Sequence, residues 1–184
     1  MRVLITGICG FVGSSLARQM LQDIVGLELL GIDNLSRPGS ELNRAWLLAA
    51  GVQVIHGDLR TIEDVDSLPA VDWVIDAAAK PSVLGGIGDA ESSRQVVENN
   101  LCATIHLLEY CKRHGAGFIL LSTSRVYSIN GLVSLRLETH GSAYRPLETQ
   151  NFKPAVSPAG LTEAYSTCAP VSLYGATGIG DPCA

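Results

Sequence analysis

Short apolar runs alternate with polar and helical stretches along the chain, and the runs predict five strands. They lie at residues 3–6, 27–33, 52–55, 71–75 and 118–122. Short apolar runs that are separated by helical segments are typical of a parallel sheet with helices on both faces. We therefore expect an α/β fold with a doubly wound parallel sheet.

Three segments carry apolar residues at the spacing of an amphipathic helix. One begins near residue 11, the second spans 41–50 and the third spans 92–114. The residues that carry the spacing are Val12, Leu16 and Met20 in the first, Leu42, Trp46 and Ala49 in the second, and Leu101, Ile105 and Leu108 in the third. Residues 81–90 are a predicted glycine-rich loop, and beyond Tyr127 about forty residues with four prolines are predicted to be mostly loop.

A glycine-rich turn follows the first strand and leads directly into the first helix. Its glycines are Gly7, Gly10 and Gly13. Glycines at such a turn let the backbone approach a pyrophosphate closely, and the free N–H groups of the helix N-terminus point at the anion. Because a strand, a glycine turn and a helix follow in that order, the pattern predicts dinucleotide binding.

Two carboxylates follow later strands at positions that suit an adenosine. Asp33 ends the second strand, twenty residues after Gly13, where a dinucleotide fold places an acid on the ribose hydroxyls. A carboxylate there repels a 2′-phosphate and favours NAD, whereas Arg37 nearby keeps NADP as an alternative. Asp58, just past the third strand, has two readings: an acceptor for the adenine amino group or an ordinary turn aspartate.

Composition narrows the class of protein. The 184 residues suit one α/β domain, and a net charge of −5 without a basic stripe argues against nucleic acid as a partner. The five cysteines include no C-x-x-C pair, which argues against a disulfide framework or zinc site and favours a reducing compartment. We see no secretion signal and no apolar run long enough to span a membrane, so we expect a cytoplasmic protein.

Taken together, these motifs resemble the extended short-chain dehydrogenase/reductase family, the NAD-dependent nucleotide-sugar epimerases and dehydratases. The matching segments are 6–13 (TGICGFVG), 33–37 (DNLSR), 57–59 (GDL), 99–101 (NNL), 121–127 (LSTSRVY) and 172–177 (SLYGAT). The second and the last of these look most like the CDP-paratose 2-epimerase (tyvelose epimerase) branch. The resemblance extends to Thr177.

The resemblance implies an epimerase that uses NAD and acts on a nucleotide sugar, with a CDP-sugar favoured. It implies that the hydroxyl of Thr123 hydrogen-bonds the sugar oxygen that is oxidised, and that Tyr174 removes the hydroxyl proton while hydride passes to the nicotinamide. Asn100 would be the asparagine of the active-site network. Read from the residues alone, Thr123 is one polar residue of a strand-end cluster with a structural role.

Sequence position and resemblance together predict the cofactor-binding residues. They are Gly7, Cys9, Gly10, Phe11, Val12, Gly13, Asp33, Asn34, Arg37, Asp58, Leu59, Ala77, Ala78, Ala79, Asn100, Ser122 and Tyr174. Ala77, Ala78 and Ala79 follow the fourth strand, and their small side chains let a cofactor lie close to the backbone.

The sequence departs from the family at one catalytic position. The family motif is Y-x-x-x-K, and four residues after Tyr174 stands Gly178. The resemblance implies that this lysine holds the nicotinamide ribose and lowers the pKa of the catalytic tyrosine, so we expect impaired catalysis. We expect residues 1–177 to form a partial NAD-binding Rossmann domain, incomplete on its C-terminal side, and 178–184 an atypical tail of out-of-frame sequence, with the substrate domain absent.

Three readings stay open. The chain is an epimerase lineage present as its cofactor half, a catalytically inactive NAD-binding module, or a non-functional fragment that does not fold stably alone. Another epimerase or dehydratase of the family is a further option for the activity. A homodimer is also an option, because the family's dimer helices lie partly within 92–114.

Overall fold

The computed structural model describes residues 1–85 and 92–178. Five parallel strands form a sheet in the order β3-β2-β1-β4-β5. The strands are β1 (Arg2–Thr6), β2 (Glu28–Asp33), β3 (Gln53–His56), β4 (Trp73–Asp76) and β5 (Gly117–Leu120). The predicted doubly wound fold is confirmed, with strand boundaries shifted by one or two residues. Residues 86–90 of the loop predicted at 81–90 and residues 179–184 of the tail lie outside the described residues.

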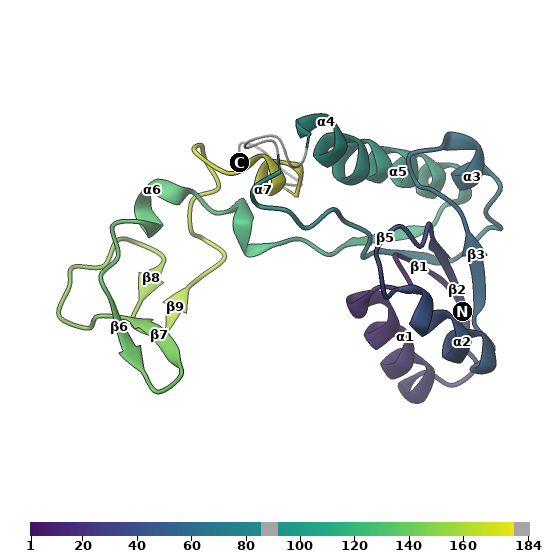
Figure 1. The fold of residues 1–184 in the computed structure, drawn as a ribbon, viewed down its shortest axis with the longest axis horizontal. Coiled ribbons are helices and arrows are strands. Elements are labelled where there is room, and N and C mark those ends of the chain that lie inside the picture. The colour runs from purple at the N-terminus through teal and green to yellow at the C-terminus, as the bar shows by residue number, and fades with distance from the viewer. Residues whose placement is uncertain (86–91, 179–184) are drawn as a thin grey trace.

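Helices cover both faces of the sheet (Figure 1). On one face lie α1 (Phe11–Asp23) and α2 (Glu41–Ala49), and on the other α3 (Ile62–Asp66), α4 (Ser93–Val96) and α5 (Ala103–His114). Neighbouring residues of β1 supply opposite cores: Val3 and Ile5 pack in the α1/α2 core, and Leu4 packs in the α3/α5 core. The helix α3 was not predicted. In the described part of the chain, no helix is long and apolar enough to cross a bilayer.

Two predicted apolar faces do not point into the core. In α2, Leu42 is 77% exposed and Ala49 is exposed, whereas Leu47 is fully buried and only Trp46 packs partly against the core. In the third helix, the predicted stripe of Leu101, Ile105 and Leu108 is 42–48% exposed. The core there is formed by Ala103, Leu107, Tyr110 and Cys111 on the opposite side. Spacing shows that residues share a face but not which face meets the sheet.

The helical segment predicted at 92–114 contains an irregular turn. Residues Val97–Cys102 form a π-helix, η1, between α4 and α5. A π-helical turn inserts one residue into the helical repeat and is frequent at functional sites. It includes Asn99 and Asn100, so the insertion changes the direction of both asparagines relative to a regular helix.

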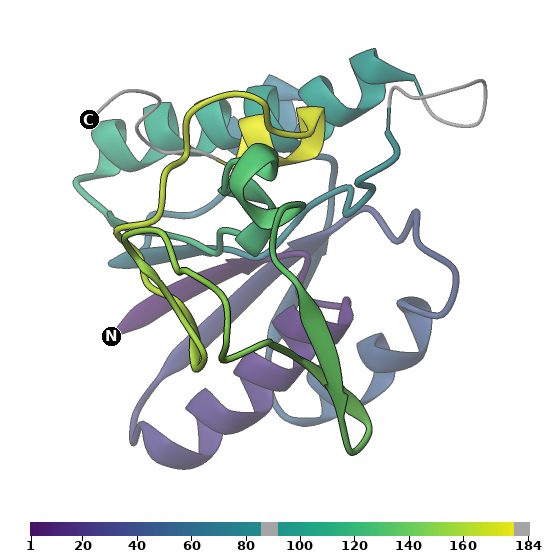
Figure 2. The same ribbon diagram turned by 90° about the vertical axis from the view of Figure 1, so that its left-hand side faces the viewer.

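The segment predicted as loop after Tyr127 contains short ordered elements. The 3₁₀ turn η2 (Ser124–Val126) comes just before this segment. Within the segment lie α6 (Ile129–Leu132), the hairpin β6 (Leu137–His140) and β7 (Ala143–Pro146), and the pair β8 (Val156–Ser157) and β9 (Gly160–Leu161). The hairpin and the β8–β9 pair form two separate small sheets that lie away from the five-stranded sheet (Figures 1 and 2). The chain then returns to the carboxyl ends of the strands in α7 (Leu173–Thr177).

Candidate cofactor cleft and reaction site

The glycine turn after β1 is too tight for side chains. A Cβ at Gly13 would lie 2.3 Å from the carbonyl oxygen of Gly7, and Gly7 itself has φ +60° with its Cβ position 3.0 Å from the Cα of Ala78. The turn leads to α1, whose first turn carries no acidic residue and whose N-cap, Gly10, makes no side-chain cap. Because the first N–H groups of a helix lack intrahelical partners, this end suits an anion.

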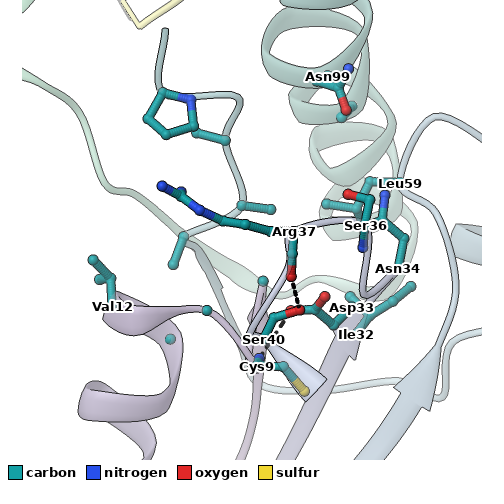
Figure 3. A pocket seen from close by; sticks show the side chains of 18 of the residues that line it. Cys9, Val12, Ile32, Asp33, Asn34, Ser36, Arg37, Ser40, Leu59 and Asn99 are labelled. Carbon is teal, nitrogen blue, oxygen red and sulfur yellow. Dashed lines mark hydrogen bonds between the residues drawn. The ribbon is translucent and has the colours of Figure 1, made fainter. Parts of the chain in front are cut away.

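Asp33 ends β2 beside the glycine turn and is half-buried. Its Oδ2 accepts the backbone N–H of Cys9 at 2.9 Å, and its Oδ1 accepts that of Leu35 at 2.8 Å. A carboxylate has about four acceptor positions, so about two remain for a ligand. Figure 3 shows Asp33 next to Cys9, with the guanidinium of Arg37 directed away from the Asp33 carboxylate.

Cys9 lies in the same turn and its side chain is fully buried. Burial, with the charge of Asp33, raises the pKa of the Cys9 thiol to about 11. The group is therefore a neutral thiol at physiological pH, which suits packing and not nucleophilic chemistry. The amide of Asn43 in α2 donates to the Cys9 carbonyl oxygen at 2.9 Å and ties the turn to that helix.

Asp58 follows β3 and is engaged by protein donors. Its carboxylate accepts the backbone N–H, Nε and Nη2 of Arg60 at 3.0, 2.9 and 2.6 Å, and Nδ2 of Asn34 at 3.2 Å. The hydrogen bond from Arg60 is the largest cause that holds the pKa of the Asp58 carboxyl well below its usual range. These contacts supply a structural role in the turn, and the adenine contact stays a prediction.

The predicted cofactor residues surround one cleft of about 800 Å³, a volume within the usual range for cofactor sites. It opens at the carboxyl ends of the strands, beside β1 and β4, where the strand order reverses and such folds bind dinucleotides. Every predicted cofactor residue except Asn100 lines it. The sequence reasoning missed lining residues on the loop after Asp33 and the turn after β3: Ser36, Pro38, Gly39, Ser40, Gly57 and Arg60.

The three predicted catalytic residues meet at a smaller hollow. Thr123, Asn100 and Tyr174 line it, at a volume of about 30 Å³. Tyr174 and Ser122 line both the hollow and the cleft, so the two spaces adjoin. The structure therefore brings together residues that lie up to 74 positions apart in the sequence.

Local hydrogen bonds fix the polar groups around this hollow. The Thr123 hydroxyl accepts the backbone N–H of Arg125 at 3.2 Å, which leaves its own proton to donate. The Ser122 hydroxyl donates to the carbonyl oxygen of Gly178 at 2.9 Å. Gly178 has φ −101°, and a Cβ there would lie 3.4 Å from Cγ2 of Thr123. The position where the expected motif has lysine thus lies next to Thr123, and a Cβ there would make only ordinary contacts.

Asn100 holds two segments of the site in place. Its Oδ1 accepts the backbone N–H of Lys80 at 2.7 Å, and its Nδ2 lies 3.2 Å from Oγ1 of Thr177 and 3.4 Å from the Lys80 carbonyl oxygen. The side chain is 8% exposed. In this structure Asn100 connects the π-helix, the loop after β4 and the end of α7.

A buried polar cluster under the cleft was not predicted. The hydroxyls of Thr6 and Thr104 lie 2.6 and 2.9 Å from the two carboxyl oxygens of Asp76, the last residue of β4. The Asp76 side chain is 3% exposed, and burial raises the pKa of its carboxyl. Because Thr6 and Asp76 lie at the ends of adjacent strands, the strand order places them side by side. The sequence carries no signal for the contact between Asp76 and Thr104 on α5.

Comparison with known proteins agrees with this geometry. Residues 3–177 match the NAD dependent epimerase/dehydratase family. The chain belongs to that family. The NAD dependence in the family's description agrees with the cofactor predicted from the sequence.

Two curated members of the epimerase/dehydratase family are similar in sequence to this chain. It is 35% identical to the CDP-paratose 2-epimerase of Salmonella typhi over 133 residues, which are 69% of this chain and 38% of that protein. It is 34% identical to the dTDP-glucose 4,6-dehydratase of Streptomyces niveus over 134 residues, 69% of this chain and 39% of that protein. The chain thus aligns with well under half of each relative.

Solved structures show the same fold. The UDP-Glc/GlcNAc 4-epimerase of Campylobacter jejuni matches with a TM-score of 0.70 at 24% identity over 96% of this chain and 45% of that one. The UDP-glucuronic acid 4-epimerase of Bacillus cereus, in complex with a UDP-sugar analogue and NAD, matches with a TM-score of 0.66 at 26% identity over 97% of this chain and 49% of that one.

Proposed function

We propose that the chain binds NAD in the large cleft and belongs to a nucleotide-sugar epimerase that oxidises and re-reduces its sugar. The observation that carries the proposal is the convergence of the glycine turn, Asp33 and the three small residues after β4 on one cleft at the carboxyl edge of the sheet. The reaction-site residues Thr123, Asn100 and Tyr174 adjoin the same cleft.

The residues of the cleft fit a dinucleotide. The Cβ-free surface of Gly7, Gly10 and Gly13 leaves backbone at the N-terminus of α1 for a pyrophosphate. The remaining acceptor positions of Asp33 suit the two ribose hydroxyls and disfavour a 2′-phosphate. Ala77, Ala78 and Ala79 would let the nicotinamide half lie against the β4 end.

Bound NAD supplies hydride acceptance and return, and the chain supplies the proton transfer and orientation. In the proposal, Tyr174 takes the proton of the sugar hydroxyl and returns it after the sugar has turned. Thr123 accepts the backbone N–H of Arg125, and its own proton remains to be donated to the same sugar oxygen. Asn100 acts by holding the loop after β4 and the end of α7 around them.

For the substrate, we propose a nucleotide sugar with a CDP-sugar favoured. The similarity to a CDP-paratose 2-epimerase supports this choice, together with the DNLSR and SLYGAT segments. The neighbouring relatives act on dTDP- and UDP-sugars by name, so the nucleotide is the first property to test.

Gly178 supports attenuated catalysis in this chain. With glycine at the lysine position of the motif, no ammonium group from that position stabilises the charged form of a tyrosine or holds the nicotinamide ribose. The same observation favours the second candidate, an NAD-binding module that does not turn over sugar.

We also propose that the chain is cytoplasmic and that it forms a homodimer. Leu101, Ile105 and Leu108 form an exposed apolar stripe along η1 and α5, and burial of such a stripe against a second copy would remove it from water. Sedimentation of the 19.4 kDa chain at twice its mass would support the dimer, and a monomer at high concentration would contradict it.

The test of the substrate proposal follows the absorbance of reduced nicotinamide. The NAD-loaded chain is mixed in turn with CDP-, UDP- and dTDP-hexoses, with Tyr174→Phe as the matched control because it removes only the hydroxyl. We expect slow reduction with a CDP-sugar that Tyr174→Phe abolishes. Faster reduction with another nucleotide would contradict the CDP preference, and equal rates in the control would contradict the role of Tyr174. NAD binding without any reduction would favour the module.

A further inference from the structure

Of the acidic residues in the described part of the chain, only Asp76 is fully buried. It ends β4 beneath the cleft, with β1 on one side and α5 on the other. None of the roles proposed above uses this carboxyl. Burying a carboxylate without a compensating charge is costly, so its protonation state has to be accounted for.

The hydrogen bonds on one side of Asp76 are settled by counting protons. The Thr6 hydroxyl oxygen accepts the backbone N–H groups of Ala77 and Ala78 at 3.1 and 3.0 Å. A hydroxyl has one proton to donate, so that of Thr6 goes to Oδ1 of Asp76 at 2.6 Å. Oδ1 is therefore an acceptor.

On the other side of Asp76, the two contacts of the Thr104 hydroxyl need two protons, and only one is present if Asp76 is ionised. The Thr104 hydroxyl lies 2.9 Å from Oδ2 of Asp76 and 2.7 Å from the carbonyl oxygen of Asn100. Both would then be acceptors, and the hydroxyl could serve only one of them. A proton on Oδ2 satisfies both contacts, since Asp76 then donates to Thr104 and Thr104 donates to Asn100.

The hydrogen-bond partners of Asp76 carry no charge: they are the hydroxyls of Thr6 and Thr104 and the backbone N–H of Ala78. Burial is the largest effect on the pKa of the Asp76 carboxyl and raises it, against the lowering effect of these hydrogen bonds. The titratable group of α5 that is influenced by it is the thiol of Cys111, whose pKa is raised by burial and then by Asp76. His106, on the same helix, directs Nδ1 to the carbonyl oxygen of Leu59. Neither the carboxyl end of β1 nor β5 carries a charged residue, and the first charged residue along the chain after Asp76 is Lys80.

We propose that Asp76 keeps its proton at neutral pH and acts as a positioning residue. Its proton completes a directed chain from Thr6 through Asp76 and Thr104 to the carbonyl of Asn100. The chain joins the end of β1, the end of β4 and the π-helix, and through Asn100 it reaches the loop after β4 and α7. The last step, the support of the cofactor cleft, rests on the proposed function, whereas the protonation does not.

Asp76→Asn tests the protonation, because an amide reproduces the neutral acid. The asparagine oxygen can accept Thr6, and its NH₂ can donate to Thr104. Melting temperatures of wild type and variant are measured from pH 5 to 8 without any ligand. Asp23→Asn, on the exposed end of α1, is the control for loss of one negative charge.

The expected sign follows from the raised pKa. The folded state keeps a proton that the unfolded chain releases near pH 3.8, so wild-type stability falls as the pH rises from there to the folded-state pKa. Relative to Asp76→Asn, the wild-type melting temperature should fall by about 3–5 °C for each pH unit in that window. A constant or increasing wild-type advantage, or an Asp76→Asn variant that fails to fold, would overturn the proposal.

A second measurement separates positioning from protonation. Thr104→Val keeps the side-chain shape and breaks the chain, and we expect it to weaken NAD binding about tenfold while Asp76→Asn stays within about threefold of wild type. Unchanged NAD affinity in Thr104→Val would overturn the positioning role. If wild type itself binds no NAD, the proposed function fails, and the ligand-free melting profiles still decide whether Asp76 carries a proton.

Discussion

The cofactor end of the cleft and its reaction end are held by different kinds of structure. At the cofactor end, Gly7, Asp33 and Ala78 sit at the ends of adjacent buried strands, and a backbone hydrogen bond joins Gly7 to Ile32 at 2.9 Å. At the reaction end, Tyr174 lies on the five-residue helix α7, which is held by Asn100 and Ser122.

This difference separates binding from catalysis. The cofactor end depends on backbone geometry that the sheet itself fixes, whereas the reaction end depends on a few side-chain contacts from distant segments. In the proposed function, the chain keeps its cofactor site while glycine at position 178 weakens its chemistry. The predictions below test that separation, beginning with the largest expected effect.

Gly13→Ala should strongly weaken NAD binding at the cofactor end of the cleft. The new Cβ would lie 2.3 Å from the Gly7 carbonyl oxygen and 2.8 Å from the Cα of Ile8, so the backbone of the turn has to move. We expect NAD affinity, measured by titration calorimetry, to fall at least about 100-fold. Gly178→Ala is the matched control, because its Cβ meets only ordinary contacts. An equal loss of NAD affinity in the two variants would contradict the separation of the cofactor end from the reaction end.

Asp33→Ala should weaken NAD more than NADP. The change removes the acceptor proposed for the ribose hydroxyls and the charge expected to repel a 2′-phosphate, while Arg37 still lines the cleft. We expect NAD affinity to fall about 10- to 100-fold and the NAD-over-NADP preference to shrink. The dissociation constants of NAD and of NADP are measured for wild type and for Asp33→Ala. An unchanged ratio of the two would show that Asp33 does not select the cofactor.

Gly178→Lys should raise the rate of the reaction with little change in NAD affinity. The φ of −101° is open to lysine, and the site faces Thr123. We expect about a tenfold rise in the rate of nicotinamide reduction by a CDP-sugar. Gly178→Ala controls for the added Cβ, and combining Gly178→Lys with Tyr174→Phe should cancel the gain. A rate that stays at the wild-type level would mean that the missing lysine is not what limits this chain.

Asp58→Asn should change acid stability by a small amount. Because the pKa of Asp58 is lowered in the fold, its contribution is present above about pH 3.8 and is lost as the pH falls through the lower folded-state value. We expect a wild-type advantage of about 1 kcal/mol or less at pH 7, since the Arg60 pair is partly exposed. Urea unfolding at pH 7, 4 and 3 measures it, and an advantage that is the same at all three would contradict the assignment.

The parts of the molecule that the sequence predicted are those fixed locally. The glycine turn, Asp33 and the alanines after β4 each follow an apolar run, and parallel strands bring their carboxyl ends to one edge. The parallel order of the sheet then placed them in one cleft without any knowledge of side-chain contacts.

What the sequence left unpredicted depends on contacts between distant residues. The Asp76–Thr104 contact joins residues 28 positions apart, and the exposure of Leu42 depends on how α2 is rotated against the sheet. The only local signal for the β6–β7 hairpin is its turn, where Gly141 takes φ +62°, because neither strand alternates between apolar and polar residues.

The central claim, that this chain by itself forms an NAD site, is tested most directly by a thermal melt with NAD, with NADP as the comparison. At a hundred times its dissociation constant, a ligand adds about 2.7 kcal/mol of stability, which is about 5–10 °C for a chain of this size. We predict a cooperative transition that NAD raises by that amount and NADP raises less. A cooperative transition that neither dinucleotide moves, at millimolar concentration, would contradict the account.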